Sequence, residues 1–351
     1  MKEVTLQGTR IRKVQRYHCN DCGALFQSQS SKLLWDIITR PLGYKAVHLT
    51  FDTLGSLRKV ARELKRTTGY SFHPHLVLDM ILELAKGCKD SFQIKEELQP
   101  HWSGYLGFDG TCVKIFGQKY TLLVGRDLKT QDLVHWRLMP HEDYQCIRIF
   151  LKEIRDKLFF PTKGIVADLD PANKAAMTDV YPHVPYQACI SHIEKDVNLQ
   201  LPKTKRTRQQ KQIKKIIREV LYARSKRLSI RAYMRLLEVE SQVKNRRSLE
   251  AIRIVKDNFL STLTHFDYPQ LPASNNVVEN VVGQLKEKIK LTRGFKKTHN
   301  AYYFLKLLAC WYRFKRFESS NYPERNGKSP LELCHAKQYP LDWVKWCQRN
   351  H

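Results

Sequence analysis

The sequence predicts an α/β fold whose core is interrupted by an all-helical segment and preceded by helices. Short apolar strand patterns crowd residues 105–190, and a basic, purely helical pattern fills residues 202–268. Apolar residues at helical spacing begin earlier, near Leu57. The chain has 351 residues, 42% of them hydrophobic, which excludes a disordered polyelectrolyte and allows more than one domain.

The charge balance predicts a polyanionic partner. Lys plus Arg number 61 against 34 for Asp plus Glu, a net charge of +27. Nucleic acid is the first expectation, because neutralising many phosphates releases bound counterions. A membrane is a weaker one, since no apolar stretch approaches the roughly 18 residues of a span. The start, MKEVTLQGTR, lacks the apolar core of a signal peptide.

The cysteines favour a reducing, cytoplasmic location. There are 9, an odd count without the spacing of a disulfide framework. Two of them, Cys19 and Cys22, form a CxxC pair within residues 1–30 that can hold one side of a zinc ion. A structural zinc needs four ligands, and the nearby His18 is poorly placed to chelate. The segment is therefore either a partial zinc ribbon or half of one that binds no metal.

Residues 31–100 contain two amphipathic helical patterns. The first has Leu57 and Leu64 on its apolar face, a polar turn with Gly69 follows, and Val77 and Leu84 belong to the second. Helix, short glycine-containing turn and helix are typical of a helix-turn-helix that binds DNA. Two such helices can also pack together without touching DNA.

The first part of the core, residues 101–201, predicts three antiparallel strands and then an alternation of helix and strand. The expected strands span Tyr105–Ile115, Tyr120–Arg126, Leu133–Leu138, the GIVAD segment that ends at Asp168, and Tyr186–Ile190. We expect turns at Phe116–Lys119 and Leu128–Gln131, and helices over 147–158, from Pro171 to about Val180, and from about His192. This order matches the RNase H-like fold.

Residues 202–270 form the helical insertion and carry an unusual density of positive charge. Only Glu219 offsets the basic residues of its first half, which are Lys203, Lys205, Arg206, Arg208, Lys211, Lys214, Lys215, Arg218, Arg224, Lys226, Arg227 and Arg231. A solvated helix face is the default explanation of a charge run. The density of one sign favours a surface that follows phosphates, with Lys211, Lys214 and Lys215 as contacts.

The last part of the core, residues 271–325, begins with a helix that Ser274 or Asn275 can cap. It carries Glu279, runs to about Leu291 and ends before Gly294. An apolar helix from Tyr302 to about Phe317 would pack on the sheet, and a polar tail, 326–351, follows.

Three acids are candidates for a metal site: Asp109, Asp168 and Glu279. Asp109 lies inside a strand between glycines, where a charge is costly unless it is paired or binds metal. Asp168 ends an apolar strand, a common position for site residues. Each also has a plain structural explanation: a turn residue, a helix cap and a first-turn acid. Asp170 remains an alternative second acid, because side chains two apart on a strand point the same way.

Four motifs give the chain its resemblance to a known family: GFDGT around Asp109, IVAD before Asp168, YQACISH, and NNVVEN around Glu279. Over about residues 106–317 the chain resembles a DDE transposase of prokaryotic insertion sequences, near the Mutator-like group. The resemblance implies that the three acids hold Mg2+ or Mn2+, cut DNA to leave a 3′-hydroxyl and join that end to target DNA.

The resemblance also assigns supporting residues. In that group a Cys and a His, here Cys189 and His192, follow the second acid. We expect Cys189 to be a buried packing residue and His192 to hydrogen-bond near the second aspartate, with metal binding as the alternative. Many families carry a basic residue seven positions after the glutamate, which is Lys286 here, on the same helix face as Glu279. Lys290 and Arg293 are further expected DNA contacts.

The expected partners are double-stranded DNA, both element ends and target, and a second copy of the chain, since two ends must be joined. Nucleoid association in the cytoplasm would follow. One rival is a catalytically inactive or domesticated DNA-binding protein, which the presence of all three acids disfavours. Another is a different RNase H-like nuclease, which the long insertion and the amino-terminal segments disfavour.

Overall fold

The computed structural model describes residues 40–53, 55–201, 204, 206–336, 339–340 and 342–347, together with the backbone of two short strands. These strands, β1 (Arg16–His18) and β2 (Leu25–Gln27), pair antiparallel. The expected zinc ligands Cys19 and Cys22 lie outside the described residues.

A five-stranded mixed sheet forms the centre of an α/β fold, in the order β5-β4-β3-β6-β7. The strands are β3 (Tyr105–Ile115), β4 (Gln118–Asp127), β5 (Leu133–Met139), β6 (Gly164–Ala167) and β7 (Tyr186–Ala188). The first three are antiparallel neighbours, whereas β6 and β7 run parallel to β3. All five expected strands are therefore present.

One turn differs from the prediction. Only Phe116 and Gly117 separate β3 from β4, instead of a turn extending to Lys119. Both residues have positive φ, 52° and 78°, the conformation that matches the twist of a two-residue hairpin. Phenylalanine rarely adopts positive φ, so the sequence contained no indication of a two-residue turn and predicted a longer one.

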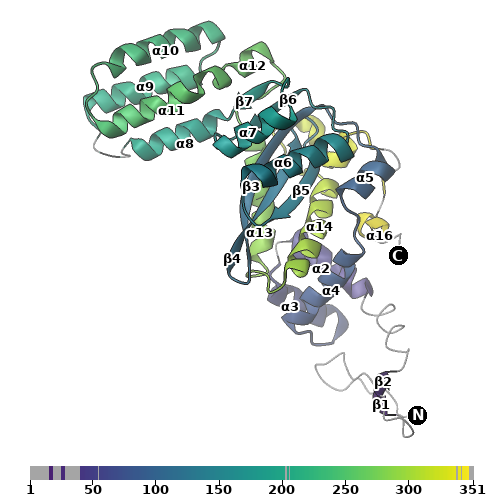
Figure 1. The fold of residues 1–351 in the computed structure, drawn as a ribbon. Coiled ribbons are helices and arrows are strands. Elements are labelled where there is room, and N and C mark those ends of the chain that lie inside the picture. Colours follow the sequence, from purple (N-terminus) through teal and green to yellow (C-terminus); the bar gives the residue numbers. More distant parts are fainter. Residues whose placement is uncertain are drawn as a thin grey trace.

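Helices cover both faces of the sheet (Figure 1). One face carries α6 (Tyr144–Lys152), its π-helical continuation η2 (Glu153–Lys157), and α7 (Pro171–Val180). The other carries α13 (Asn276–Lys290) and α14 (Thr298–Phe314). Along β3, even-numbered side chains such as Phe108 pack with α6, and odd-numbered ones such as Val113 pack with α13 and α14, as alternation requires.

The helices that precede the sheet pack against α14 through α4. They are α2 (Arg40–Phe51), α3 (Leu57–Thr68), α4 (Pro74–Lys86) and α5 (Ser91–Leu98). Ser56 caps the start of α3, and Gly69 ends it at a φ of 78°. Both helices expected from the apolar spacing are present. After α14 follow η3 (Pro323–Arg325), α15 (Pro330–Leu333) and α16 (Trp343–Cys347).

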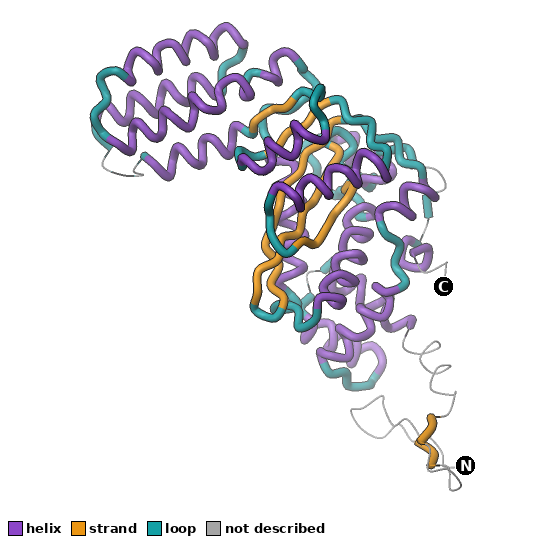
Figure 2. Tube along the Cα trace, viewed as in Figure 1, coloured by secondary structure: helices purple, strands orange, loops and turns teal. Residues whose placement is uncertain are grey.

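The basic segment folds as helices that project from the sheet edge beyond β7 (Figures 1 and 2). It comprises α9 (Arg208–Leu221), α10 (Lys226–Glu240), α11 (Arg246–Thr262) and α12 (Thr264–Asp267). The preceding α8 (Ile190–Gln200), which was expected in the first part of the core, packs with them. These helices share a hydrophobic cluster of their own, separate from the two clusters on the faces of the sheet. The insertion is therefore stabilised mainly by its own core.

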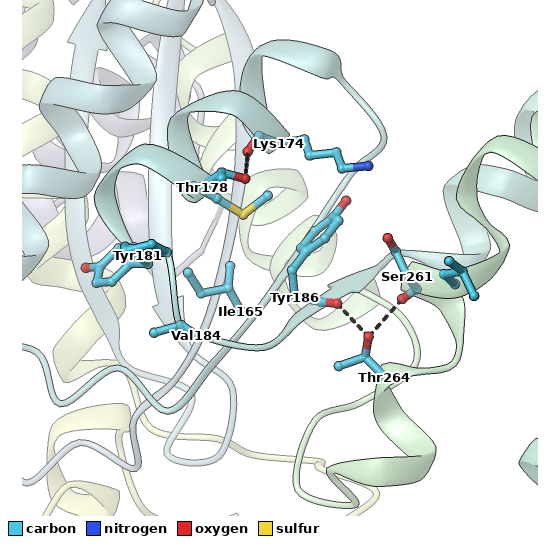
Figure 3. A pocket seen from close by; sticks show the side chains of 11 residues that line it. Ile165, Lys174, Thr178, Tyr181, Val184, Tyr186, Ser261 and Thr264 are labelled. Atoms are coloured by element: carbon cyan, nitrogen blue, oxygen red, sulfur yellow. Dashed lines mark hydrogen bonds between the residues drawn. The ribbon is translucent and has the colours of Figure 1, made fainter.

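Hydrogen bonds join this insertion to β7. The Thr264 hydroxyl donates to the carbonyl of Tyr186 at 2.7 Å, and the amide of His265 donates to the side chain of Gln187 at 2.8 Å. A cavity of about 320 Å³ lies at the joint, lined by side chains of α7, β6, β7 and α11 with Thr264 (Figure 3). None of the three candidate acids lines this cavity.

A buried ion pair connects α14 to the turn between β4 and β5. Arg313 donates through Nε and Nη2 to the two carboxylate oxygens of Asp132, at 2.8 and 2.7 Å. The indole of Trp102 donates to the same carboxylate at 2.8 Å. Asp132 and Arg313 are 0% and 1% exposed, so the pair depends on its mutual hydrogen bonds rather than on water.

Several element boundaries differ from the prediction, including the end of β7, which lies at Ala188 instead of Ile190. The helix expected over 147–158 changes to π-helix at Glu153, α14 ends at Phe314 rather than near Phe317, and α8 begins at Ile190, before His192. No described helix combines the length and apolarity that a membrane span requires.

Candidate active site

Strand register places Asp109 and Asp168 side by side. In the parallel pairing of β3 and β6, Gly107 lies opposite Val166. Two residues further along each strand are Asp109 and, just past the end of β6, Asp168. Neighbouring strands lie about 4.8 Å apart. Because side chains alternate between the two faces of a sheet, Asp109 and Asp168 both belong to the face that α13 covers.

Glu279 reaches the same face because the start of α13 packs directly on β3. A Cβ added at Gly107 would lie 2.6 Å from Val278 Cγ2 and 2.7 Å from Asn275 Oδ1, so only glycine permits this approach. The Asn275 side chain donates to the carbonyl of Phe108 at 2.9 Å. Glu279 lies in the first turn of α13, with its side chain 43% exposed.

Asn275 is the N-cap residue of α13, as the sequence allowed, but its side chain makes no capping hydrogen bond. The amide group is used instead as a bridge to the sheet. The backbone N–H of Asn275 donates to Cys189 Sγ at 3.1 Å. This residue thus fixes the helix that carries Glu279 to both β3 and the end of β7.

The acids affect one another electrostatically. The pKa of Asp109 is raised to about 6, mainly by burial, and the negative charges of Asp168 and Glu279 contribute to this rise. A hydrogen bond from the backbone N–H of Gly110 acts in the opposite direction. The predicted acids are therefore brought together. A carboxyl pKa raised by burial and by neighbouring negative charges is the condition that a divalent cation would relieve.

A fourth carboxylate, Glu142, belongs to the same cluster and was missed by sequence reasoning. A Cβ on Gly110 would lie 2.5 Å from its Oε2, so Glu142 extends over the strand beside Asp109. Loss of hydration raises the pKa of Glu142 to about 7, and the charges of Asp168, Asp109 and Asp170 add to this effect. Glu142 is an exposed acid in a polar loop, a pattern with no signal of its own. Gly110 was the only sequence hint.

His192 lies beside the third acid and is also within electrostatic reach of the second. Its Nδ1 is 3.4 Å from Glu279 Oε1. Hydrogen bonding to Cys189 raises the pKa of His192 to about 9, and the charges of Glu279 and Asp168 contribute. Cys189 is fully buried, as expected. The ligand atoms of Cys189, His192 and Glu279 lie within 4.8 Å of one another, so metal binding by this trio remains geometrically open.

Asp168 and Asp170 have different environments. Asp170 caps α7, accepting the amide of Ala172 at 2.7 Å, and is exposed. The Asp168 carboxylate accepts a hydrogen bond from the side-chain Nδ2 of Asn173, and the Tyr186 hydroxyl donates to the backbone carbonyl of Asp168 at 2.8 Å. Asp168 adds to the electrostatic elevation of Asp109, which favours it over Asp170 as the second acid.

Comparison with known protein families identifies the family of the chain. Residues 124–312, more than half of the chain, match the family described as Transposase, Mutator family. The chain belongs to the Mutator family of transposases. The match includes Asp168 and Glu279 and begins after Asp109. No curated protein matches the sequence.

The basic residues expected to contact DNA lie on two helical surfaces of this transposase. Lys211, Lys214 and Lys215 are on α9, where Lys214 also donates to the side chain of Asn198 at 2.5 Å. Lys286 and Lys290 are exposed on α13, and the exposed Arg293 follows that helix. The α13 set lies on the element that carries Glu279, whereas the α9 set lies on the projecting insertion (Figure 1).

Proposed function

We propose that this transposase cuts DNA at the ends of a mobile element and joins those ends to target DNA, using Asp109, Asp168 and Glu279 to hold divalent metal. The single observation that carries the proposal is the convergence of three acids from β3, the end of β6 and the start of α13 on one side of the sheet. The three acids are far apart in the sequence, so local roles such as turn residue or helix cap do not explain why they lie together.

We infer that residues 101–201 and 271–325 form one RNase H-like core. Three antiparallel strands followed by two parallel ones, with helices on both faces, support this assignment. The helical segment 202–270 is then an insertion in that core. The helices within 31–100 supply a helix-turn-helix, and residues 1–30 a partial zinc ribbon.

The donor set suits Mg2+ or Mn2+, because hard divalent ions prefer carboxylate oxygen and the pKa values of Asp109 and Glu142 are raised by burial and by neighbouring carboxylates. Divalent ions bound there would stabilise charge on the entering and leaving oxygens of a phosphodiester. Asp109 and Asp168 come from rigid strands and Glu279 from a helix held by Asn275, so their positions are preorganised. Lys286, exposed further along α13, would hold a phosphate next to the acids.

DNA binding is assigned to the positively charged helices. Lys211, Lys214 and Lys215 on α9 would follow the phosphates of an element end. Lys290 and Arg293 would extend the contact beside the catalytic face. Because both ends of an element must be processed together, the working form is a homodimer or a larger assembly.

The test compares isosteric variants in magnesium-dependent cleavage of DNA that carries the inverted repeats flanking the coding region. Asp109→Asn and Asp168→Asn should lose cleavage and strand transfer while end binding stays near the wild-type level. Asp170→Asn is the matched control, since asparagine caps helices as well as aspartate does, and it should keep activity. Wild-type cleavage by Asp109→Asn would refute the proposal. Loss of activity in Asp170→Asn alone would reassign the second acid.

A further inference from the structure

Three buried cysteines from distant parts of the chain meet beside α14, away from the carboxylates. Cys88 follows α4, Cys310 lies within α14, and Cys347 ends α16. All three are at most 2% exposed, and their Sγ atoms lie within 4.8 Å of one another. Sγ of Cys88 is 3.1 Å from Sγ of Cys310, which is also 3.2 Å from the carbonyl oxygen of Lys89.

Cationic side chains lie near these sulfurs, although Arg313 is paired with Asp132 and Lys89 with Glu97, and burial raises the pKa of Cys88 and Cys347. Lys306 and Arg313, on the same helix as Cys310, both act electrostatically to favour its thiolate. Lys89 is 3% exposed, and its ammonium lies 4.9 Å from the ring of Trp346 on α16. Cationic neighbours stabilise thiolates, which are the form of cysteine that binds metal. Cysteines that serve only to fill a core do not need such neighbours.

We propose that Cys88, Cys310 and Cys347 form a three-thiolate site for a thiophilic metal ion, with Zn2+ as the expected occupant. Zn–S bonds of about 2.3 Å place tetrahedral ligands about 3.8 Å apart, which is compatible with three sulfurs that all lie within 4.8 Å of one another. The Lys89 carbonyl or a water molecule completes the coordination. Binding releases the thiol protons to solvent and forms three sulfur–metal bonds, with no change of oxidation state.

Such an ion would explain how a very short terminal helix is fixed. Helix α16 has 5 residues, too few to be stable by itself. Its described contacts include ring packing of Trp343 and Trp346 on Phe314 of α14. A metal shared by α16, α14 and the end of α4 joins the carboxyl terminus to the amino-terminal helices. The site is independent of DNA cleavage and remains testable if the proposed function is wrong.

The experiment measures zinc per chain in the full-length protein, purified with reductant and zinc. Because Cys19 and Cys22 also offer thiolates, all variants carry Cys19→Ser and Cys22→Ser. This background chain should retain one zinc, and adding Cys347→Ser should reduce zinc to near zero. The matched control adds Cys334→Ser, which alters a fully buried cysteine outside the cluster and should keep the zinc. Circular dichroism establishes that each variant is folded.

A second measurement covers the case in which Cys347→Ser does not fold. Co2+ exchanged into the background chain should give intense sulfur-to-cobalt charge-transfer absorption, which requires thiolate ligands. The proposal is overturned if the background chain holds no zinc, if folded Cys347→Ser keeps it, or if cobalt gives no charge-transfer bands. Mass-spectrometric detection of a Cys88–Cys310 disulfide in the reduced, zinc-supplemented protein would overturn it as well.

Discussion

The contact between Gly107 and α13 makes a quantitative prediction about catalysis. In Gly107→Ala the new methyl group would lie 2.6 Å from Val278 Cγ2, 2.7 Å from Asn275 Oδ1 and 2.7 Å from Leu128 Cδ2. Ordinary carbon contacts are about 3.5–4.0 Å, so the start of α13 must recede by about 1 Å. Glu279 follows Val278 directly and moves with it. Misplacement of a catalytic group by about 1 Å can cost ~100-fold in rate.

The assay is single-turnover cleavage of element-end DNA with magnesium, together with thermal unfolding. Gly107→Ala should cleave roughly 100-fold more slowly while binding DNA normally, and overpacking should destabilise it by about 1–3 kcal/mol. Gly283→Ala is the matched control on the same helix, since a Cβ there meets nothing within 4 Å. It should cleave normally and be more stable by about 0.5–1 kcal/mol. Wild-type cleavage by a folded Gly107→Ala would refute the positioning of Glu279 by this contact.

Further predictions concern stability and metal affinity. Asp132→Asn leaves the Arg313 charge buried and uncompensated, so urea unfolding should show a loss of about 3–5 kcal/mol in the free energy of unfolding. The surface variant Glu250→Gln, which breaks an ion pair with Arg253, should leave the stability nearly unchanged. Burial opposes ionisation of Glu153, but hydrogen bonds from three basic side chains lower its pKa to about 2. The contribution of Glu153 to the free energy of unfolding is therefore complete above about pH 4.5 and is lost as the pH falls towards 2. In acid unfolding experiments, Glu153→Gln should lose less stability over this pH range than the unmodified protein. Glu142→Gln should raise the magnesium concentration for half-maximal cleavage by about tenfold without weakening DNA binding; an unchanged magnesium dependence would exclude Glu142 from the site.

Local patterns were sufficient for most of the fold. Strands β3 to β7 follow from apolar runs bounded by turn residues, and the order of elements follows from reading them in sequence. The acids Asp109 and Asp168 were identifiable because a charge within or at the end of an apolar strand is unusual. Glu279 was identifiable only through the family resemblance, because an acid in the first turn of a helix is ordinary.

What the sequence could not predict depends on contacts between distant segments. Asn275 has the local chemistry of a helix cap, yet its side chain donates to the Phe108 carbonyl 167 residues away. His192 was expected near Asp168, and its contact with Glu279, much further along the chain, had no local signal. Glu142 enters the cluster because Gly110 leaves space for it. In each case the contact joins segments that are distant in the sequence, so no local pattern could predict it.

The insertion and the third acid are coupled at one point of the fold. The chain leaves the sheet at Cys189 and Ile190 and returns at Ala273 and Asn275 after passing through the whole helical insertion. The amide of Ile190 donates to the Ala273 carbonyl at 3.1 Å, and the amide of Asn275 donates to Cys189 Sγ at 3.1 Å. These bonds close the base of the insertion directly before the helix that carries Glu279. A displacement of the insertion would therefore act first on the start of α13, where Glu279 lies.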